Sequence, residues 1–276
     1  MPDDRYRFTI GDFECLAIKD TTAMIDTHQL FHNVDKTRYT NLLQARDENP
    51  QQAELSHNVL AVFSDDWVLI DTGIGTLDKR DGQVAEILDD EEIRPEHIIL
   101  THAHADHYGG LMTEDGSETF GNTPVYICQN EWITSVSGDY ADHHPRRAQM
   151  LEQYLLPVER QIERIECLNM NEILPGFSVL QLPGHTMHHI GILIESRNQR
   201  LIVAADALIH PLHLENLDWR CGFDTDHEQA RASRVELAEL ALELDALVMA
   251  YHFPFPGLGR IEREGTGYRW QAIVDS

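Results

Sequence analysis

The sequence has few lysines, no closely spaced cysteines and no long apolar run, and each absence argues against a class of protein. Lysine occurs only at positions 19, 36 and 79, and the formal net charge is −26. Such an acidic chain repels a phosphate backbone unless a local basic patch offsets its field. The densest basic spots are Pro145-Arg146-Arg147 and the pair Arg160 and Arg164. We therefore expect no nucleic-acid partner.

The cysteines and the apolar stretches argue for a soluble cytoplasmic protein. The four cysteines form no C-x-x-C pair, so zinc knuckles and thioredoxin-like chemistry lack support. Cys15, Cys128 and Cys167 lie among apolar residues and are expected to be small buried hydrophobes, which fits a reducing compartment. No apolar run follows the first residues, and none reaches the roughly 18 residues of a membrane span. We expect no signal peptide and no membrane association.

Apolar runs and helical periodicity predict one domain of two sheets. Strands are expected at Phe8–Ile18, Asn58–Phe63, Trp67–Ile70, His97–Leu100, Val125–Cys128, Phe177–Leu182, Ile190–Glu195, Leu201–Ala205, Leu247–Ala250 and Tyr268–Ile273. Helices are expected at Asp78–Glu92, Asn130–Val136, Pro145–Glu163 with a kink at Pro157, and Glu228–Leu244. Two sets of strands, each followed by helices, predict packed sheets with helices outside. No Gly-, Pro- or Ser-rich linker divides residues 1–276.

Two stretches, 20–56 and Leu208–Thr225, are expected to be irregular. A connection as long as 20–56 inside a compact domain is usually a functional lid or a partner-binding arm. We therefore expect the 20–56 insertion to cover a cleft or to form a dimer interface, with a homodimer as the assembly.

Metal-type side chains are concentrated in the motif His102-Ala103-His104-Ala105-Asp106-His107. The motif follows the apolar run at 97–100, so we place it in a turn at a strand end, where several side chains can converge. Imidazole and carboxylate suit zinc and its neighbours, and Gly109-Gly110 allows a tight turn behind them. A loop that is rich in histidine by chance is the alternative, but the density of donors favours a metal site.

Three more candidate ligands also follow apolar runs. His185 comes after 180–184, Asp206 after 201–205 and His252 after 247–251. A lone histidine at a strand end is more often capped or solvated, but burying a carboxylate such as Asp206 without a cation is costly. Because donors recur at the ends of four strands, we predict one metal centre built from all of them.

This set of motifs resembles the metallo-β-lactamase-fold hydrolase superfamily. The pattern His-x-His-x-Asp-His, Pro-Gly-His-Thr, Ala-Asp and a late His covers most of the chain, and Asp71-Thr72-Gly73 matches a further turn of that family. The resemblance implies an α+β fold, an αββα sandwich of two mixed β-sheets flanked by helices, with a two-metal site between the sheet edges. One departure is Met187-His188-His189, where many members have a second Pro-Gly-His. His189 still aligns, so we expect only a local loop difference.

The resemblance also implies a role for each motif residue. The ligands would form two sets bridged by one carboxylate: His102, His104 and His185; then Asp106, His107 and His252; with Asp206 between the two ions. Two divalent ions are expected, zinc first, with manganese, iron or cobalt as alternatives. A hydroxide that bridges two such ions is a nucleophile near neutral pH. Asp106 and Asp206 would be the catalytic carboxylates, and Asp71 and His189 would orient ligands by hydrogen bonding.

Several branches of the superfamily fit this chain less well. β-Lactamases usually have Arg at the position of His107 and Cys or Ser at that of Asp206. Flavodiiron oxidoreductases have Glu at the position of His104 and need a flavin domain, and nuclease branches need a basic surface. Glyoxalase II enzymes share all the ligands, but they hold glutathione with basic residues of a C-terminal helical region. The tail after His252 is short and has arginine only at positions 260, 263 and 269.

The segment Tyr251–Arg260 favours one branch. Its His-x-Pro-Phe-Pro-Gly pattern resembles the methyl parathion hydrolase group and its lactonase relatives. The resemblance implies hydrolysis of a small-molecule lactone or ester, with promiscuous phosphotriesterase activity. The candidates for the substrate pocket are Phe253, Phe255, Trp219 and His210, with rigid loop packing as the alternative for the two phenylalanines.

Two other functions stay open from the sequence. One is a glyoxalase II-like thioesterase, and the other is a non-enzymatic metal-binding sensor or scaffold. A structural zinc site requires neither two metals nor an open water position, so the complete ligand set favours an enzyme.

Overall fold

The computed structural model describes residues 4–77, 82–137 and 145–273. Within these residues the chain forms two seven-stranded sheets. The first sheet has the order β1 (Arg5–Ile10), β2 (Phe13–Asp26), β3 (Gln52–Phe63), β4 (Trp67–Ile70), β5 (His97–Leu100), β6 (Val125–Cys128) and β7 (Ile162–Ile165). The second has the order β14 (Gly267–Ala272), β13 (Leu258–Glu264), β12 (Leu247–Ala250), β11 (Gln199–Ala205), β10 (Ile190–Ser196), β9 (Phe177–Gln181) and β8 (Glu172–Leu174).

Both sheets are mixed, as the resemblance implies. In the first sheet β1 to β4 pair antiparallel, whereas β4 to β7 pair parallel. In the second sheet only the pairing of β11 with β12 is parallel among the described residues. The parallel pairs matter for the site because their strands end at the same edge of a sheet.

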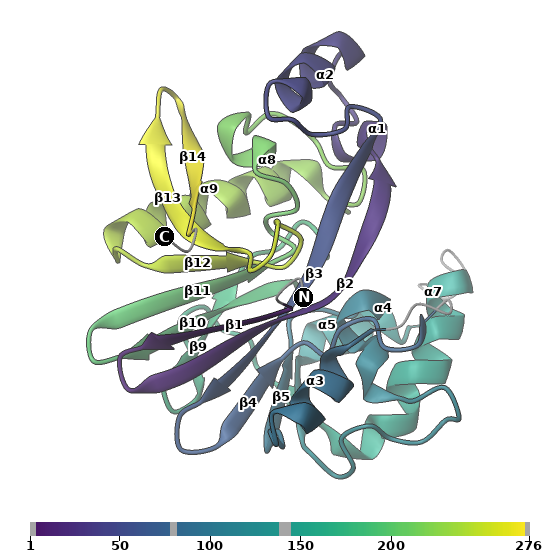
Figure 1. Cartoon of the computed structure of the whole chain (residues 1–276). Coiled ribbons are helices and arrows are strands. Elements are labelled where there is room, and N and C mark those ends of the chain that lie inside the picture. Colours follow the sequence, from purple (N-terminus) through teal and green to yellow (C-terminus); the bar gives the residue numbers. More distant parts are fainter. Residues whose placement is uncertain (1–3, 78–81, 138–144, 274–276) are drawn as a thin grey trace.

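Three apolar layers hold the two sheets and their helices together. The alternation of strand side chains divides β2, which sends Cys15 and Ala17 into the layer shared with the second sheet and Leu16 and Ile18 into the layer under the helices. The helices of the first face are α3 (Val84–Asp90), α5 (Gln129–Ser135) and α7 (Pro145–Met150), and α9 (His227–Glu243) covers the second sheet. This is the predicted αββα sandwich (Figure 1).

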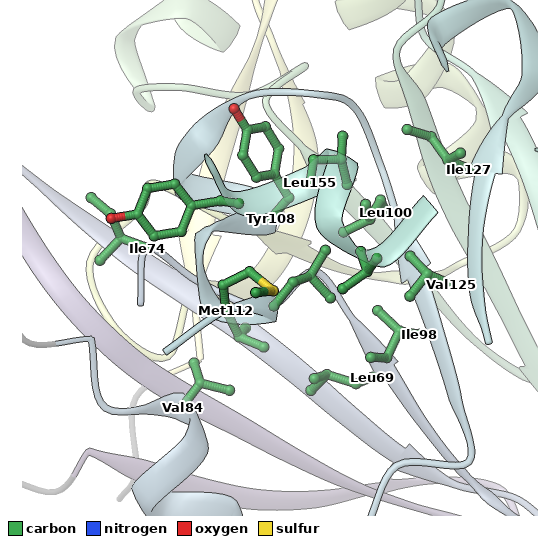
Figure 2. Packing of buried hydrophobic residues seen from close by; sticks show 14 of the residues in the cluster. Leu69, Ile74, Val84, Ile98, Leu100, Tyr108, Met112, Val125, Ile127 and Leu155 are labelled. Carbon is green, nitrogen blue, oxygen red and sulfur yellow. The ribbon is translucent and has the colours of Figure 1, made fainter. Parts of the chain in front are cut away.

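The helical layer on the first sheet is densely packed. Val84 of α3 and Leu69 lie at one side of this cluster and Leu155 at the other, and Ile98 belongs to the same cluster (Figure 2). All four side chains are almost fully buried. Burial of this kind contributes roughly 25 cal/mol per Å² of apolar surface removed from water, so this layer is a rigid base for the loops above it.

The structure corrects the prediction that residues 20–56 are irregular. Strand β2 continues to Asp26, β3 begins at Gln52, and the two are paired along this whole extension. The link between them holds the short helices α1 (Thr27–Leu30) and α2 (Lys36–Gln44). The extended β2–β3 pair and its helices, which we call the β2–β3 arm (20–56), rise beside α8 (Leu212–Glu215) in Figure 1.

The arm was missed because its tip is held by contacts distant in sequence. Leu30 and Phe31 are fully buried against Ile209, Leu212 and other residues of the 208–225 stretch. The polar residues on its exposed faces hide the period of two that marks a strand.

Other differences concern the ends of elements. The expected strand Phe8–Ile18 is a hairpin that turns at Gly11, whose φ of +59° suits glycine. The expected helix Pro145–Glu163 becomes α7, a π-helical turn η3 (Leu151–Leu155), a 3₁₀ segment η4 (Leu156–Gln161) and strand β7. The backbone of Val158 is non-helical, directly after the residue that predicts the kink.

Some predicted strands have the expected bounds, and others were not foreseen. Strands β4, β5, β6 and β12 begin and end as predicted, whereas β8 and β13 were absent from the prediction. The expected helix at Asp78–Glu92 corresponds to α3, and residues 78–81 lie outside the described residues. No helix among the described residues is long and apolar enough to cross a membrane.

Candidate metal centre

The predicted ligands meet where strands of both sheets end. His102 follows β5, and the short helix α4 (Ala105–Tyr108) supplies Asp106 and His107. On the other side, Asp206 follows β11 directly and His252 comes shortly after β12. Two residues at such strand ends have positive φ, Asp71 at +61° and Ala205 at +44°. Backbone conformations of this kind are costly and cluster at functional sites.

Three histidines form one compact group, which we call the three-histidine subsite (His102, His104, His185). Together with Asp206 they offer one ligand atom each, and these atoms all lie within 4.8 Å of one another. The Nε2 atom of His185 is 2.9 Å from Nδ1 of His104 and 3.2 Å from Oδ2 of Asp206. Zn–N bonds of about 2.0–2.1 Å place the donors of a tetrahedral ion roughly 3–3.5 Å apart. The spacing of this group suits a single ion.

The remaining predicted ligands form what we call the mixed subsite (Asp106, His107, His252). The Nε2 atoms of His107 and His252 lie 3.9 and 3.7 Å from Oδ2 of Asp106. They also lie 3.2 and 3.3 Å from the two carboxylate oxygens of Asp206. Asp206 therefore faces both subsites, which is the place that a bridging ligand requires.

Unpartnered polar atoms test whether this site fits metal ions. Nε2 of His102 and of His107 and Oδ1 of Asp206 are buried and have no hydrogen-bond partner. A buried polar atom without a partner costs about 1–3 kcal/mol, and such atoms are rare in folded proteins. Here they cluster and are of the kinds that bind zinc and similar cations. The residues present therefore fit divalent ions.

In His107 and His252, the ring nitrogen Nδ1 makes a hydrogen bond to another part of the protein. His107 donates from Nδ1 to Oδ2 of Asp71 at 2.7 Å, and Asp71 also accepts from the amide and the hydroxyl of Thr101. His252 donates from Nδ1 to the carbonyl oxygen of Ser56 at 3.0 Å. Hydrogen bonds at Nδ1 leave Nε2 of each ring as the free lone pair and fix the ring orientation. Asp71 thus has the contact predicted for it.

A buried ion pair braces His185 from behind. Its Nδ1 lies 3.4 Å from Oδ1 of Asp224, whose Oδ2 accepts from Nη1 of Arg234 at 3.2 Å. Asp224 and Arg234 are both buried. The next residue, Thr225, donates from its amide and its hydroxyl to the carbonyl oxygen of His185. The backbone and the ring of His185 are therefore fixed by the segment that leads into α9.

His189 lies beside the site and contacts the backbone of a ligand. Its Nδ1 donates to the carbonyl oxygen of Leu182, and its Nε2 accepts from the amide of Asp206 at 3.2 Å. Burial, reinforced by His185, lowers the pKa of His189 to about 3, in keeping with a neutral ring that both donates and accepts. His189 therefore contacts the main chain at Asp206.

The two subsites differ in electrostatic character. Burial lowers the pKa of His102 well below its usual range, and the nearby His107 and His104 add to the effect. Burial likewise lowers the pKa of His104, and His185 and Arg147 contribute. These two rings are therefore neutral in the metal-free protein at ordinary pH.

In the mixed subsite the carboxylates have the opposite effect. Burial would lower the pKa of His107, but Asp206, Asp71 and Asp106 outweigh it and hold that pKa well above the usual value. Asp206 does the same for His252, whose pKa is also raised. Burial would raise the pKa of Asp206, yet the facing His252 and His107 keep it well below its usual range.

A cavity of about 330 Å³ opens above both subsites. Most of its walls are apolar, and two guanidinium groups, Arg146 and Arg147, also line it. The apolar lining residues are Ala23, Ile25, Leu55, Ile74, Leu77, Ala103, Ala105, Tyr108, Met150, Ile209 and Phe223. Part of this lining comes from the β2–β3 arm, which therefore forms a wall of the cavity.

None of the residues predicted for the substrate pocket is among those that line this cavity. Phe253 is buried against the ring of Trp270, with ring centroids 4.9 Å apart. Phe255 packs against the core between the sheets. The contacts of Phe253 and Phe255 thus favour rigid packing of their loop over a place in the substrate pocket.

Trp219 and His210 also point elsewhere. Trp219 is buried against Phe31 of the arm, with ring centroids 5.2 Å apart. His210 lies 3.1 Å from Oε2 of Glu48 and lines a different cavity. The sequence could not show that the arm folds over this stretch and occupies these side chains.

Several residues of the site were not predicted. Glu131 accepts from the amide of Ala103 and the hydroxyl of Thr186, so it ties together two ligand-bearing loops. Tyr251 stacks on His107, with ring centroids 4.0 Å apart, and donates to the carbonyl oxygen of Asp106. Asp224, Arg234 and His57 complete this set. Only His57 had a signal in the sequence, as part of the polar triplet Ser56-His57-Asn58 directly before the apolar run 59–63.

Comparison with known proteins places this geometry in a family. A family model described as "Metallo-beta-lactamase superfamily" matches residues 53–244. An N-acyl homoserine lactonase from a Bacillus species is 29% identical over 167 residues, 56% of this chain and 55% of the relative. A hydroxyacylglutathione hydrolase from Shewanella halifaxensis (strain HAW-EB4) is 30% identical over 143 residues, 49% of this chain and 46% of the relative. The chain thus spans about half the length of the curated relatives it matches.

Solved structures share the fold along the whole chain. The hydrolase AbOPH of the beta lactamase superfamily superposes with a TM-score of 0.90 at 21% identity, covering 100% of this chain and 99% of that one. AidC, a dizinc quorum-quenching lactonase solved with a product, gives a TM-score of 0.88 at 21% identity, covering 99% and 100%. At this identity the likeness shows the fold.

Proposed function

The chain belongs to the metallo-β-lactamase superfamily, and from that premise we propose that it is a dinuclear metal-dependent hydrolase that cleaves a lactone or an ester. The observation that carries the proposal is the convergence of two groups of donors on Asp206, beside a cavity with apolar walls. Two divalent ions bound there would lower the pKa of a water molecule enough to give a nucleophile near neutral pH. Zinc is the first candidate, with manganese, iron or cobalt as alternatives.

The two catalytic carboxylates have different tasks in this proposal. The side chain of Asp206 is 4% exposed and faces both subsites, so it positions the two ions. The side chain of Asp106 is 27% exposed and lines the cavity. Burial would raise the pKa of Asp106, but His107, His57 and His252 outweigh burial and keep it ionised. Asp106 is therefore placed to accept a proton from the attacking water molecule and to pass it to the leaving oxygen of the substrate.

The cavity suits a small molecule with an apolar part. Its volume of about 330 Å³ is within the range of ligand sites. Ile25 and Leu55 of the arm and Ile209 and Phe223 opposite can enclose an acyl chain or an aryl group. The lactonase relatives support a lactone. Phosphotriesters are proposed as promiscuous substrates because both reactions require developing charge on oxygen to be stabilised.

Metal analysis and a substrate panel test the proposal. Purified protein should contain two divalent ions per chain and should hydrolyse at least one of the acyl-homoserine lactones, γ- and δ-lactones, aryl esters or paraoxon-type phosphotriesters. The matched control is Asp206→Ala, which should lose both metal and activity. A fully metallated protein that is inactive on every compound would contradict the proposal.

A thioesterase of the glyoxalase II type is the second candidate, because one relative is a hydroxyacylglutathione hydrolase. Against it, the described residues after His252 form β13 and β14, without a helical region to hold glutathione. S-Lactoylglutathione in the same panel separates the two: turnover faster than on any lactone or ester would favour the thioesterase. Metal binding without any turnover would favour a sensor or scaffold.

The assembly and the location of the protein are proposals too. We propose a cytoplasmic homodimer in which the outer side of the β2–β3 arm lies at the interface, where Met24 is 51% exposed. The arm would then serve both as a wall of the cavity and as a contact between subunits. Light scattering of the wild type and of Met24→Asp tests this, since a monomeric wild type would contradict it.

A further inference from the structure

His57 occupies a place in the metal centre that the family motifs do not assign. It lies in β3, opposite Thr21, next to a register shift between Lys19 and Thr21 of β2. Irregularities of this kind redirect side chains and are frequent beside active sites. The ring of His57 is 3% exposed and lines the cavity above the metal centre. Its position is thus inside the site rather than in the apolar core.

The contacts of His57 point to the Asp106 carboxylate. Its Nε2 lies 3.4 Å from Oδ2 of Asp106, closer than the 3.7 Å of His252 and the 3.9 Å of His107. His57, Asp106 and His252 form a separate group whose ligand atoms all lie within 4.8 Å of one another. His57 therefore meets the same spacing criterion as the ligands that the motifs predict.

The remaining contacts of the His57 ring are mostly with other rings. Its Nδ1 is buried without a hydrogen-bond partner, and the rings of Tyr251 and His252 flank it at 5.6 and 5.1 Å. By contrast, Nδ1 of His107 and of His252 is held by a partner. Burial of an imidazole costs free energy unless its polar atoms are used. The polar contact of the His57 ring is with the Asp106 carboxylate, which is itself a proposed ligand.

We propose that His57 is an additional ligand of the ion in the mixed subsite, binding next to Asp106 and His252. The inference rests on the proposed dinuclear site and extends it. The mixed subsite would then offer more protein donors than the three-histidine subsite, so the two ions would be unlike. A larger donor set suits ions that take more than four ligands, such as manganese, iron or cobalt, better than tetrahedral zinc.

The experiment detects the bond between metal and ring directly. Full-length protein labelled with ¹⁵N is loaded with ¹¹³Cd, and the histidine side chains are assigned with His57→Gln as the reference. A one-bond ¹¹³Cd–¹⁵N coupling to the ring of His57 is expected. Titration should show that His57→Gln weakens one of the two metals at least tenfold, as loss of even an outer partner does, and leaves the other unchanged.

The matched control is His210→Gln, which removes a buried ring that also lies beside a carboxylate, Glu48, but outside the metal cavity. It should keep both metals at wild-type affinity. Wild-type protein that holds two cadmium ions without coupling to His57 would overturn this inference and leave the proposed function intact. Protein that binds no metal would overturn both. If His57→Gln fails to fold, His57→Asn supplies the assignment, and the coupling itself is still measured in the wild type.

Discussion

The two subsites of the metal centre are built from the same kinds of side chain but differ in their electrostatics. In the three-histidine subsite, the ring centroid of His102 lies 4.5 Å from that of His104 and 5.0 Å from that of His185. Burial lowers the pKa of His102 and of His104, so both rings are neutral. In the mixed subsite, carboxylates surround His107 and raise its pKa. The first subsite is therefore ready for a cation, whereas the second must lose protons before it can accept one.

Removal of Asp206 should affect both subsites alike, because its carboxylate faces both of them. Asp206→Ala is expected to lose both metals and to lower kcat/KM by more than the roughly 10²–10³-fold cost of one lost transition-state donor. Metal content and lactone or ester hydrolysis are the measurements. The control Asp218→Ala changes a carboxylate whose side chain is 88% exposed and should behave as wild type. Full activity of Asp206→Ala with two metals bound would exclude the bridging role.

Loss of Arg234, which pairs with Asp224 behind His185, should lower the free energy of unfolding. Removal of one partner of a buried ion pair costs about 3–5 kcal/mol, and Arg234→Met would leave Asp224 without its cation behind His185. The free energy of unfolding of the metal-free protein, from urea denaturation, measures this. Arg231→Met is the matched control, since Arg231 lies on the same helix in an exposed pair with Asp218 and should cost under about 1 kcal/mol.

The double variant Asp224→Asn, Arg234→Met separates charge from packing. It leaves neither charge buried alone, so it should recover part of the stability that Arg234→Met loses. An Arg234→Met variant as stable as Arg231→Met would show that the pair does not brace His185.

Asp71→Asn should weaken the mixed subsite alone. The substitution removes the charge that faces Nδ1 of His107, and loss of such a partner lowers metal affinity about 10–100-fold. Competition with a chelator should show one weakened ion and one unchanged ion. Asp66→Asn is the control at the other end of β4, where the side chain is 59% exposed. Equal weakening of both ions would mean that the subsites are not independent.

The candidate ligands have clearer signals in the sequence than the residues that hold them in place. His102, His185, Asp206 and His252 could be proposed because each follows an apolar run, and the end of such a strand is a local feature. The αββα order of elements follows from the same runs and is confirmed by the two mixed sheets.

The supports depend on contacts between distant segments. Arg234 pairs with Asp224 across the start of α9, and no local feature of the sequence marks this pair. Asp224 itself lies in a stretch without periodicity. The arm was missed for the same reason, since Phe31 and Trp219 are far apart in the chain and meet only in the fold. Trp219 and His210, which we predicted for the substrate pocket, instead contact Phe31 and Glu48 of the arm.

The smallest expected effect is a different pH dependence of the two metals. The raised pKa of His107 keeps its ring protonated to a pH above its usual range, and a metal binds only the neutral ring. Each displaced proton makes the affinity of the mixed subsite rise about tenfold per pH unit until that pKa is passed. The pKa values of His102 and His104 are lowered, so the other ion should bind with little change between about pH 6.5 and 8. Chelator competition across this range measures both slopes in one protein, and each subsite is the control for the other. Parallel slopes would mean that the carboxylates of the mixed subsite do not set its affinity.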